Sequence, residues 1–147
     1  MIERMLQAIY CDDIRHEAGE KLSYMGAYNG ILYVPSFPTK LPKFCIAVKV
    51  VSPMTRTFES LLIQILKDED ILQEISLNQE QLQIRNGPQE KDPQVDEEDL
   101  VQTVDVNFAF VPFQLDEPFI LRVRAETNDG EIIRGLGLRV AQFPSKE

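Results

Sequence analysis

The residues best suited to chemistry in this sequence lie close together near its N-terminus. They are acidic, basic or imidazole side chains: Asp12, Asp13, Arg15, His16 and Glu17. Hard cations prefer carboxylate ligands and histidine is a common general base, so the group suits a small cation-dependent hydrolase. Asp12 and Asp13 with Arg15 would instead clamp a polar ligand. The simpler interpretation is a solvated turn in which Asp13 pairs with Arg15, since the spacing matches no known calcium loop.

A second set of acidic and amide side chains lies in predicted turns: Asp68, Asp70, Asn128 and Asp129. Loop carboxylates gathered at one end of a β-sandwich can bind Ca²⁺, and Asp12 would join them there. Asp and Asn are also frequent in turns because their side chains bond the nearby backbone. We therefore predict no metal site, no cofactor and no catalytic residue.

Other sequence features also have structural explanations. A single histidine removes most nucleophilic and metal-hydrolase templates. Gly135-Leu136-Gly137 lacks the spacing and the following helix of a phosphate loop, so we expect a bulge or close packing. Cys11 and Cys45 each lie in an apolar, strand-like context, which predicts two buried reduced thiols, with a disulfide or metal pair as the alternative.

Aromatic side chains are frequent in the N-terminal half: Tyr10, Tyr24, Tyr28, Tyr33, Phe37 and Phe44. Packing in the core and at its rim is one role for them. The alternative is a ligand groove or a partner surface. Because loops often carry binding residues, we name Tyr28, Tyr33 and Phe37, beside the loop Pro35–Pro38, as the preferred interaction surface.

Apolar residues at every second position predict strands, because the side chains of a strand alternate between two faces. The clearest runs are Val104–Phe110, Phe119–Ala125 and Ile132–Val140. A hairpin turn at 128–130 separates the last two runs.

Four earlier segments are also predicted strands. Met5–Cys11 is the first, and Phe44–Val50 is apolar on both faces, as a covered central strand is. Leu22–Tyr28 and Ile31–Val34 flank Asn29-Gly30, which predicts either a hairpin or one long bent strand.

The segment Phe58–Leu66 fits both the helical and the strand period. We predict a strand, because it contains β-branched residues and a polar turn follows it, leading to a second run at Ile71–Leu77.

The sequence also predicts one short helix, Gln79–Asn86. Asn78 and Gln81 have the spacing of a capping box, and Gly87 suits the residue that ends the helix. Residues 88–99 form an acidic, solvated surface loop that is too short to separate two domains.

About seven to nine short strands with turns between them indicate a mostly β fold. We predict an antiparallel β-sandwich of immunoglobulin or C2-like type. The 147 residues fit a single domain, 1–147.

The net charge of −9 argues against nucleic acid and acidic membranes as partners. The N-terminus lacks the features of a signal peptide, and no apolar run approaches the roughly 20 residues that span a bilayer. We therefore expect a cytoplasmic protein, in a bacterial cell or a phage-infected host.

Several short motifs in the N-terminal third occur in a fixed order: Tyr10-Cys11-Asp12-Asp13-Ile14-Arg15, 19–23, 26–28, Val34-Pro35-Ser36-Phe37-Pro38 and 41–45. Through them the chain resembles an uncharacterised family of small bacterial and phage proteins, a domain of unknown function. The resemblance covers residues 10–53, with a looser match in the final hairpin, and residues 54–103 add nothing to it. It implies bacterial or phage origin and an intracellular single domain, and it assigns no activity or catalytic residue.

These observations favour a non-enzymatic binding or interaction module of bacterial or phage origin. Its partner would be a protein or a small molecule, for example a host component that a phage accessory protein binds. The alternatives are the cation-dependent hydrolase at Asp12, Asp13, His16 and Glu17, and a structural protein of a phage or bacterial assembly. A homo-oligomer would fit this last role.

Overall fold

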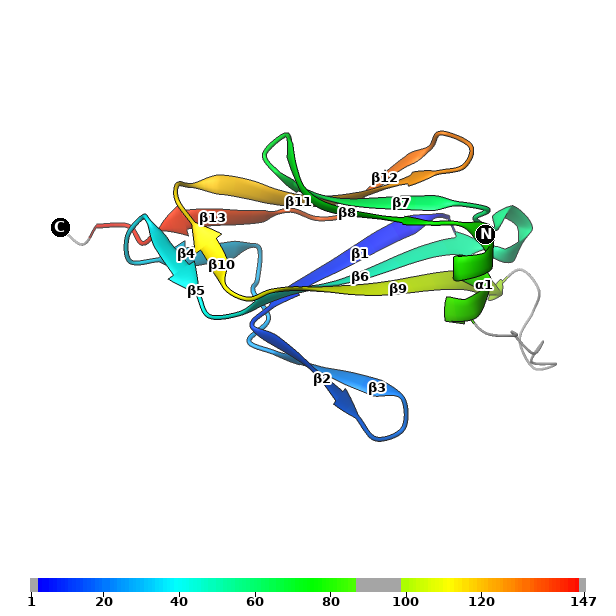
Figure 1. Ribbon diagram of the computed structural model, residues 1–147, viewed down its shortest axis with the longest axis horizontal. Helices are drawn as coiled ribbons and strands as arrows, with labels where there is room; N and C mark the ends of the chain where they lie inside the picture. Colours follow the sequence, from blue (N-terminus) through cyan, green and yellow to red (C-terminus); the bar gives the residue numbers. More distant parts are fainter. Residues whose placement is uncertain (1–2, 87–98, 146–147) are drawn as a thin grey trace.

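Two β-sheets packed face to face form the body of the protein in the computed structural model (Figure 1), which describes residues 3–86 and 99–145. The first sheet has the order β1-β6-β9: Met5–Cys11, Phe44–Pro53 and Val101–Phe110. The second has the order β4-β13-β11-β7-β8, with β12 paired to β11: Ile31–Val34, Leu138–Gln142, Phe119–Thr127, Leu61–Lys67, Asp70–Leu77 and Ile132–Arg134. The predicted mostly β, sandwich-like fold is therefore confirmed.

Two small two-stranded sheets complete the fold. β5 (Thr39–Leu41) pairs with β10 (Phe113–Leu115) at one end of the body. β2 (Asp13–Glu17) pairs with β3 (Lys21–Met25) in a hairpin that projects from the first sheet. A short 3₁₀ turn, Met54–Arg56, follows β6.

The core lies between the two large sheets and is supplied by alternating side chains. In β11 the burial alternates along the strand, with Phe119, Leu121 and Val123 buried, as predicted. β6 is central in its sheet, paired antiparallel with β1 and β9, and is buried on both faces over most of its length. Each apolar side chain removed from water in this way contributes about 1.5–3 kcal/mol.

The ambiguous segment is a strand. β7 pairs antiparallel with β8 and β11, and Leu61, Ile63 and Ile65 are buried between the sheets. Its pairing with a strand on each side decides between the two periods, so the strand prediction is confirmed. Phe58 lies before the strand and is buried as well.

The short helix α1 spans Gln79–Asn86, as predicted. The backbone N–H of Asn78 donates to Gln81 Oε1 and the N–H of Gln81 donates to Asn78 Oδ1, both at 2.9 Å. These reciprocal bonds form the predicted capping box and satisfy donors that the first helical turn leaves free. The proposed helix-ending Gly87 and most of the acidic loop 88–99 lie outside the described residues.

The strand count and the pairing differ from the prediction. The described residues hold thirteen strands, more than the seven to nine expected. β4 pairs with β13 in parallel, so the sandwich is not wholly antiparallel. Asn29-Gly30 forms neither a hairpin turn nor a bent strand, because β3 pairs with β2 whereas β4 joins the large sheet.

The predicted run Ile132–Val140 is broken into β12 and β13. The Tyr10 hydroxyl of β1 donates a 2.7 Å hydrogen bond to the carbonyl of Leu136, which holds the chain out of the ladder there. A Cβ at Gly135 would come within 2.5 Å of the Leu6 side chain, so the chain packs closely there, as the sequence suggested. No helix among the described residues is long and apolar enough to cross a bilayer.

Candidate functional site

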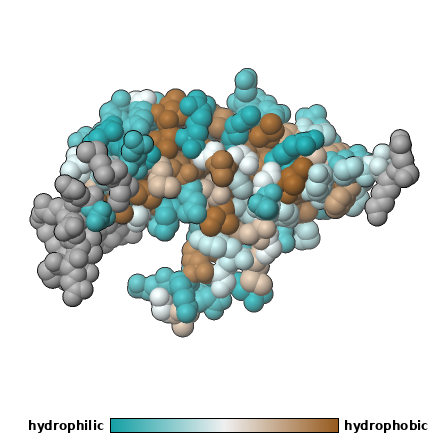
Figure 2. Space-filling view, turned by 180° about the vertical axis from the view of Figure 1, so that it is seen from behind, coloured by the Kyte–Doolittle hydropathy of each residue, from teal (hydrophilic) through white to brown (hydrophobic). Residues whose placement is uncertain are grey.

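The β2–β3 hairpin carries Asp13, Arg15, His16 and Glu17, four of the five polar residues selected near the N-terminus. The stretch predicted as a solvated turn is instead strand β2, whose five residues all pair with β3. Gly19 and Glu20 form the tip with positive φ angles of 84° and 58°. Seen from behind, the hairpin is a lobe below the body with a hydrophilic tip (Figure 2).

The hairpin has an apolar face and a charged face. Paired residues of an antiparallel ribbon point to the same side, so the register separates two sets. The first face carries Ile14, His16, Leu22 and Tyr24. The second carries Asp13, Arg15, Glu17, Lys21, Ser23 and Met25.

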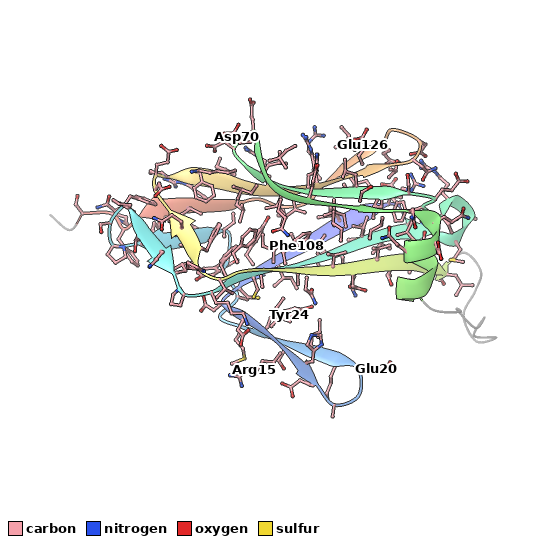
Figure 3. The ribbon with its side chains drawn as sticks, viewed as in Figure 1. Arg15, Glu20, Tyr24, Asp70, Phe108 and Glu126 are labelled. Atoms are coloured by element: carbon pink, nitrogen blue, oxygen red, sulfur yellow. The ribbon has the colours of Figure 1, made fainter. Side chains whose placement is uncertain are left out.

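The apolar face is directed at the outer surface of the β1-β6-β9 sheet. Figure 3 shows Tyr24 between the hairpin and that sheet, with Arg15 on the other side of the hairpin. A narrow cleft of about 10 Å³ lies beside Tyr24, lined on the sheet side by residues that include Ile9, Ala47 and Asn107. This volume is near that of one probe sphere, too small for an organic ligand.

The root of the hairpin is fixed by Asp12 and Tyr28. The N–H of Asp12 donates to the Met25 carbonyl at 2.9 Å, and the Tyr28 hydroxyl donates to Asp12 Oδ1 at 2.5 Å. The Tyr28 ring packs against the buried Phe44, with centroids 5.9 Å apart. Burial and the bond to Asp12 raise the pKa of Tyr28, so its hydroxyl stays a donor at neutral pH. Asp12 therefore orients the hairpin.

Asp13 ties the first residue of β2 to the body. Its Oδ1 accepts from Lys43 Nζ at 2.7 Å, and Arg15 lies 3.8 Å from Oδ2. The hydrogen bond from Lys43 holds the pKa of Asp13 below its usual range and raises the pKa of Lys43. The predicted Asp13–Arg15 pair is present, but the shorter contact is with Lys43.

The β2–β3 hairpin forms a separate two-stranded ribbon. Neither strand pairs with any other strand in the described parts of the chain, so both edges of the ribbon present unpaired backbone groups. An isolated two-stranded ribbon is marginal in water, and the contacts at the root supply the missing support. Unpaired strand edges are ready templates for an added strand.

The remaining predicted site residues lie elsewhere. Tyr33 is on β4, in the other large sheet, where its ring stacks on Phe143 at 5.1 Å and both are exposed. Phe37 is half-buried and packs against the core, as the rim role expects. The structure thus brings Tyr28 to the Asp12–Asp13 root and does not bring Tyr33 there.

The residues of the hydrolase alternative do not converge. Asp13 and Glu17 lie on the charged face, His16 lies on the apolar face, and Asp12 is bonded to Tyr28. Across residues 3–86 and 99–145, no three His, Cys, Asp or Glu side chains are grouped so that they could hold a metal ion.

The turn carboxylates also do not gather with Asp12. Asp129 accepts hydrogen bonds from Arg4 and Arg56, each at 3.0–3.2 Å, and Glu131 is bound by the same two arginines. Asp68 Oδ1 accepts from the N–H of Ile120 at 3.0 Å. These residues stabilise loops, as the alternative explanation from turn chemistry expected.

The two cysteines are opposite each other across β1 and β6. Both are free and buried, which confirms the prediction. Burial raises the pKa of Cys11 to about 11 and also raises that of Cys45.

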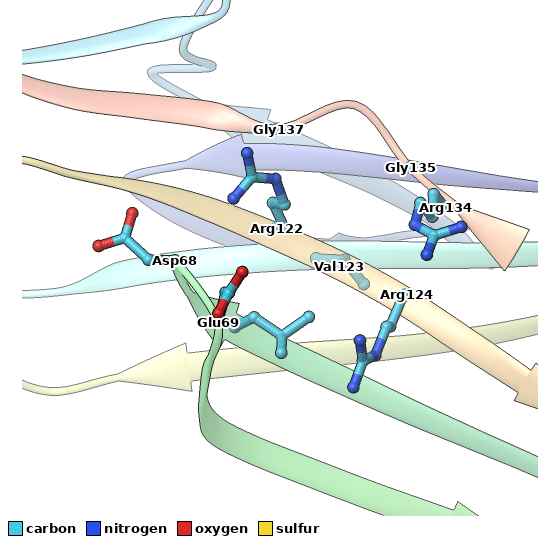
Figure 4. Close-up of a pocket in the computed structure, with 9 residues that line it drawn as sticks. Asp68, Glu69, Arg122, Val123, Arg124, Arg134, Gly135 and Gly137 are labelled. Atoms are coloured by element: carbon cyan, nitrogen blue, oxygen red, sulfur yellow. The ribbon is translucent and has the colours of Figure 1, made fainter. Parts of the chain in front are cut away.

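Sequence reasoning missed a depression on the outer face of the second sheet. It has a volume of about 430 Å³ and is lined in part by three arginines, Arg122, Arg124 and Arg134 (Figure 4). In the sequence these arginines look like ordinary solvent-facing residues of alternating strands. The predicted hairpin at 128–130 was the signal that could have placed Arg124 beside Arg134.

Comparison with known proteins identifies a family without an assigned role. The model of a family of unknown function, DUF6941, matches residues 6–141. The match therefore also runs through residues 54–103, which had not contributed to the resemblance. No curated protein and no solved structure matches the chain.

Proposed function

The chain belongs to DUF6941, a family of unknown function, and we propose that it is a non-enzymatic binding module whose β2–β3 hairpin holds an extended segment of a partner protein. One observation carries the proposal. The hairpin is anchored at its root and turns an apolar face to the β1-β6-β9 sheet, while both of its edges lack strand partners in the described chain.

An extended protein segment fits this geometry better than a small molecule. A strand that adds to a free edge gains main-chain hydrogen bonds, and its alternate side chains reach one face of the ribbon. That face offers Ile14, Leu22 and Tyr24. The cleft beside Tyr24 is too small for an organic ligand.

A different protein is a better occupant than a second copy. The net charge of −9 makes two copies of the chain repel each other. A neutral or basic partner is not repelled by this charge. The setting we propose is a bacterial cell or a phage-infected host, with a host component as the partner of a phage accessory protein.

Site-specific photo-crosslinking tests this function. A photoreactive phenylalanine analogue replaces Tyr24, on the apolar face, and in a matched protein it replaces Ile71, an exposed residue of β8 in the other sheet. In a bacterial lysate, Tyr24 is expected to give a discrete crosslinked protein and Ile71 is not.

The crosslinked protein is then purified and mixed with the unmodified chain. Direct binding of the two purified proteins supports the proposal. Equal crosslinking from both positions, or a crosslinked protein with no affinity for the unmodified chain, contradicts it.

A further inference from the structure

The arginine depression lies where the second sheet is interrupted. β11 continues its pairing with β12 through the N–H of Gly135, which donates to the Val123 carbonyl at 3.0 Å, and resumes with β13 at Leu138. Between these points the chain carries Gly135 and Gly137, which have no side chains to fill the space beside Arg122. The Tyr10 hydroxyl, on β1 of the first sheet, donates to the Leu136 carbonyl and so holds this segment out of the β11 ladder.

A row of polar side chains crosses four strands at one edge of the depression. Glu74, Gln64, Arg124 and Arg134 are successive partners on β8, β7, β11 and β12. Gln64 Nε2 donates to Glu74 at 2.7 Å, and Gln64 Oε1 accepts from Arg124 Nε at 2.8 Å. Gln64 is buried, so Arg124 is held in place by a fixed neighbour. The polar row thus preorganises one guanidinium at the depression.

The arginines around the depression are not neutralised by ion pairs. Arg124 and Arg134 are direct cross-strand partners, an arrangement of like charges that destabilises a sheet. In the described part of the chain, neither they nor Arg122 lies within ion-pair distance of a carboxylate. The chain has 24 acidic and 15 basic residues, so carboxylates are abundant.

Two arginines elsewhere in the fold, Arg4 and Arg56, are paired with carboxylates. Arg4 and Arg56 each contact Asp129 and Glu131 at 3.0–3.1 Å. At the depression, Asp68 and Glu69 lie on the β7–β8 turn at the opposite rim, and Asp68 is already bonded to the backbone of Ile120. The three arginines and the two carboxylates thus lie on different sides of the depression, and no ion pair joins them in the described chain.

We propose that this depression binds a small phosphate monoester. A carboxylate occupies one guanidinium fork, whereas a phosphate dianion has three terminal oxygens and can accept from two or three guanidinium groups. The volume of about 430 Å³ lies within the range of small-molecule sites and leaves room for the organic part. The acidic rim formed by Asp68 and Glu69 meets hydroxyl or amino groups of that part and disfavours a polyanion.

Calorimetric titration of the full chain tests the proposal, with inorganic phosphate and ribose 5-phosphate as probes and succinate as the carboxylate comparison. Ionic strength is kept constant, because surface charge effects depend on salt. We expect saturable one-to-one binding of both phosphate probes. Binding of succinate alone overturns the phosphate assignment, and no saturable binding of any probe overturns the site.

Arg122→Gln and Arg134→Gln test the contacts. Each removes a charge-assisted donor and is expected to weaken phosphate binding by about tenfold or more. Arg139→Gln is the matched control, since Arg139 is exposed on β13 and lies outside the depression. Equal loss of affinity in the control overturns the proposal.

Nuclear magnetic resonance of the wild-type chain gives a reading that does not depend on the variants. The backbone amide of Gly137 lines the depression and is expected to shift on titration with ribose 5-phosphate, whereas that of Gly19, at the hairpin tip, is not. If the Gly137 amide resonance does not shift at a saturating concentration of ribose 5-phosphate, the proposed location of the site is wrong.

Discussion

The Tyr28 hydroxyl donates a 2.5 Å hydrogen bond to Asp12, which joins the segment that leaves the β2–β3 hairpin to the residue that precedes it. Asp12 was selected from the sequence as a candidate ligand of a cation or a substrate. In the fold it instead sets the direction in which the hairpin projects. The charged residues of β2 that follow Asp12 therefore lie on a hairpin that is fixed at its root.

Tyr28→Phe is expected to make the β2–β3 hairpin more mobile. Loss of the hydroxyl leaves Asp12 without that donor and costs about 1 kcal/mol of unfolding free energy. Hydrogen exchange measured by mass spectrometry should accelerate at residues 13–25 and stay unchanged in β6. Tyr33→Phe is the matched control, because no hydrogen bond from the Tyr33 hydroxyl is present in the described residues. Equal acceleration in both variants would show that the Tyr28 hydroxyl does not anchor the hairpin.

Gly26→Ala should disrupt the root more severely. Gly26 has a φ of 65°, and a Cβ there would clash with the carboxyl group of Asp12. Gly30→Ala is the control, with a φ of 81° but no atom within 4 Å of the added Cβ. The control is expected to lose about 1 kcal/mol of unfolding free energy and Gly26→Ala distinctly more, measured by urea unfolding. Equal losses would contradict the close contact between Gly26 and Asp12.

The Asp129 network predicts a pH-dependent contribution to stability. Hydrogen bonds from Thr127 and Arg56 hold the pKa of Asp129 well below its usual range. The unfolded chain therefore binds the proton more readily, and the stabilisation is present above the unfolded pKa of about 4 and lost as the pH falls below it. Asp129→Asn should destabilise the protein at pH 7, with the difference shrinking below about pH 4.

Thermal melting across this pH range measures the effect. Asp70→Asn is the control, since Asp70 is exposed and makes no ion pair among residues 3–86 and 99–145. A difference between Asp129→Asn and the wild type that stays constant down to the acid limit would exclude the ionised carboxylate as its cause.

The two cysteines should be unreactive in the folded protein. Cys11 and Cys45 are 0% and 3% exposed, and burial raises both pKa values, so little thiolate is present or accessible. With Ellman's reagent at pH 8 we expect no reaction in the native state and reaction of both thiols in guanidinium chloride. Rapid labelling of the folded chain would show that the β1–β6 pair opens locally.

Local patterns were sufficient for much of the sandwich. The sequence predicts β9 and β11 from the alternation of their apolar residues, and α1 from the capping box that precedes it. Those signals depend on residues close in sequence. β7 required a choice between two periods, and its β-branched residues favoured the strand that the structure has.

The elements that were missed depend on distant contacts. β2 is too polar to show alternation, and its order depends on Tyr28 and Lys43. The break between β12 and β13 depends on Tyr10 from the other sheet, and the parallel pair joins β4, in the N-terminal third, to β13 near the C-terminus. Likewise, the arginine depression exists only when β7, β11, β12 and this break are assembled. These contacts join residues that are far apart in the sequence, so no local sequence pattern predicts them.

The affinity of the crosslinked partner for two hairpin variants tests the proposed function most directly. Leu22→Asp and Ser23→Asp each add one negative charge at neighbouring positions of β3, on the apolar and the charged face respectively. Isothermal titration calorimetry with the purified partner should show a large loss of affinity for Leu22→Asp and near wild-type affinity for Ser23→Asp, with both variants folded by circular dichroism. Equal affinity of the two variants would contradict binding at the apolar face of the hairpin.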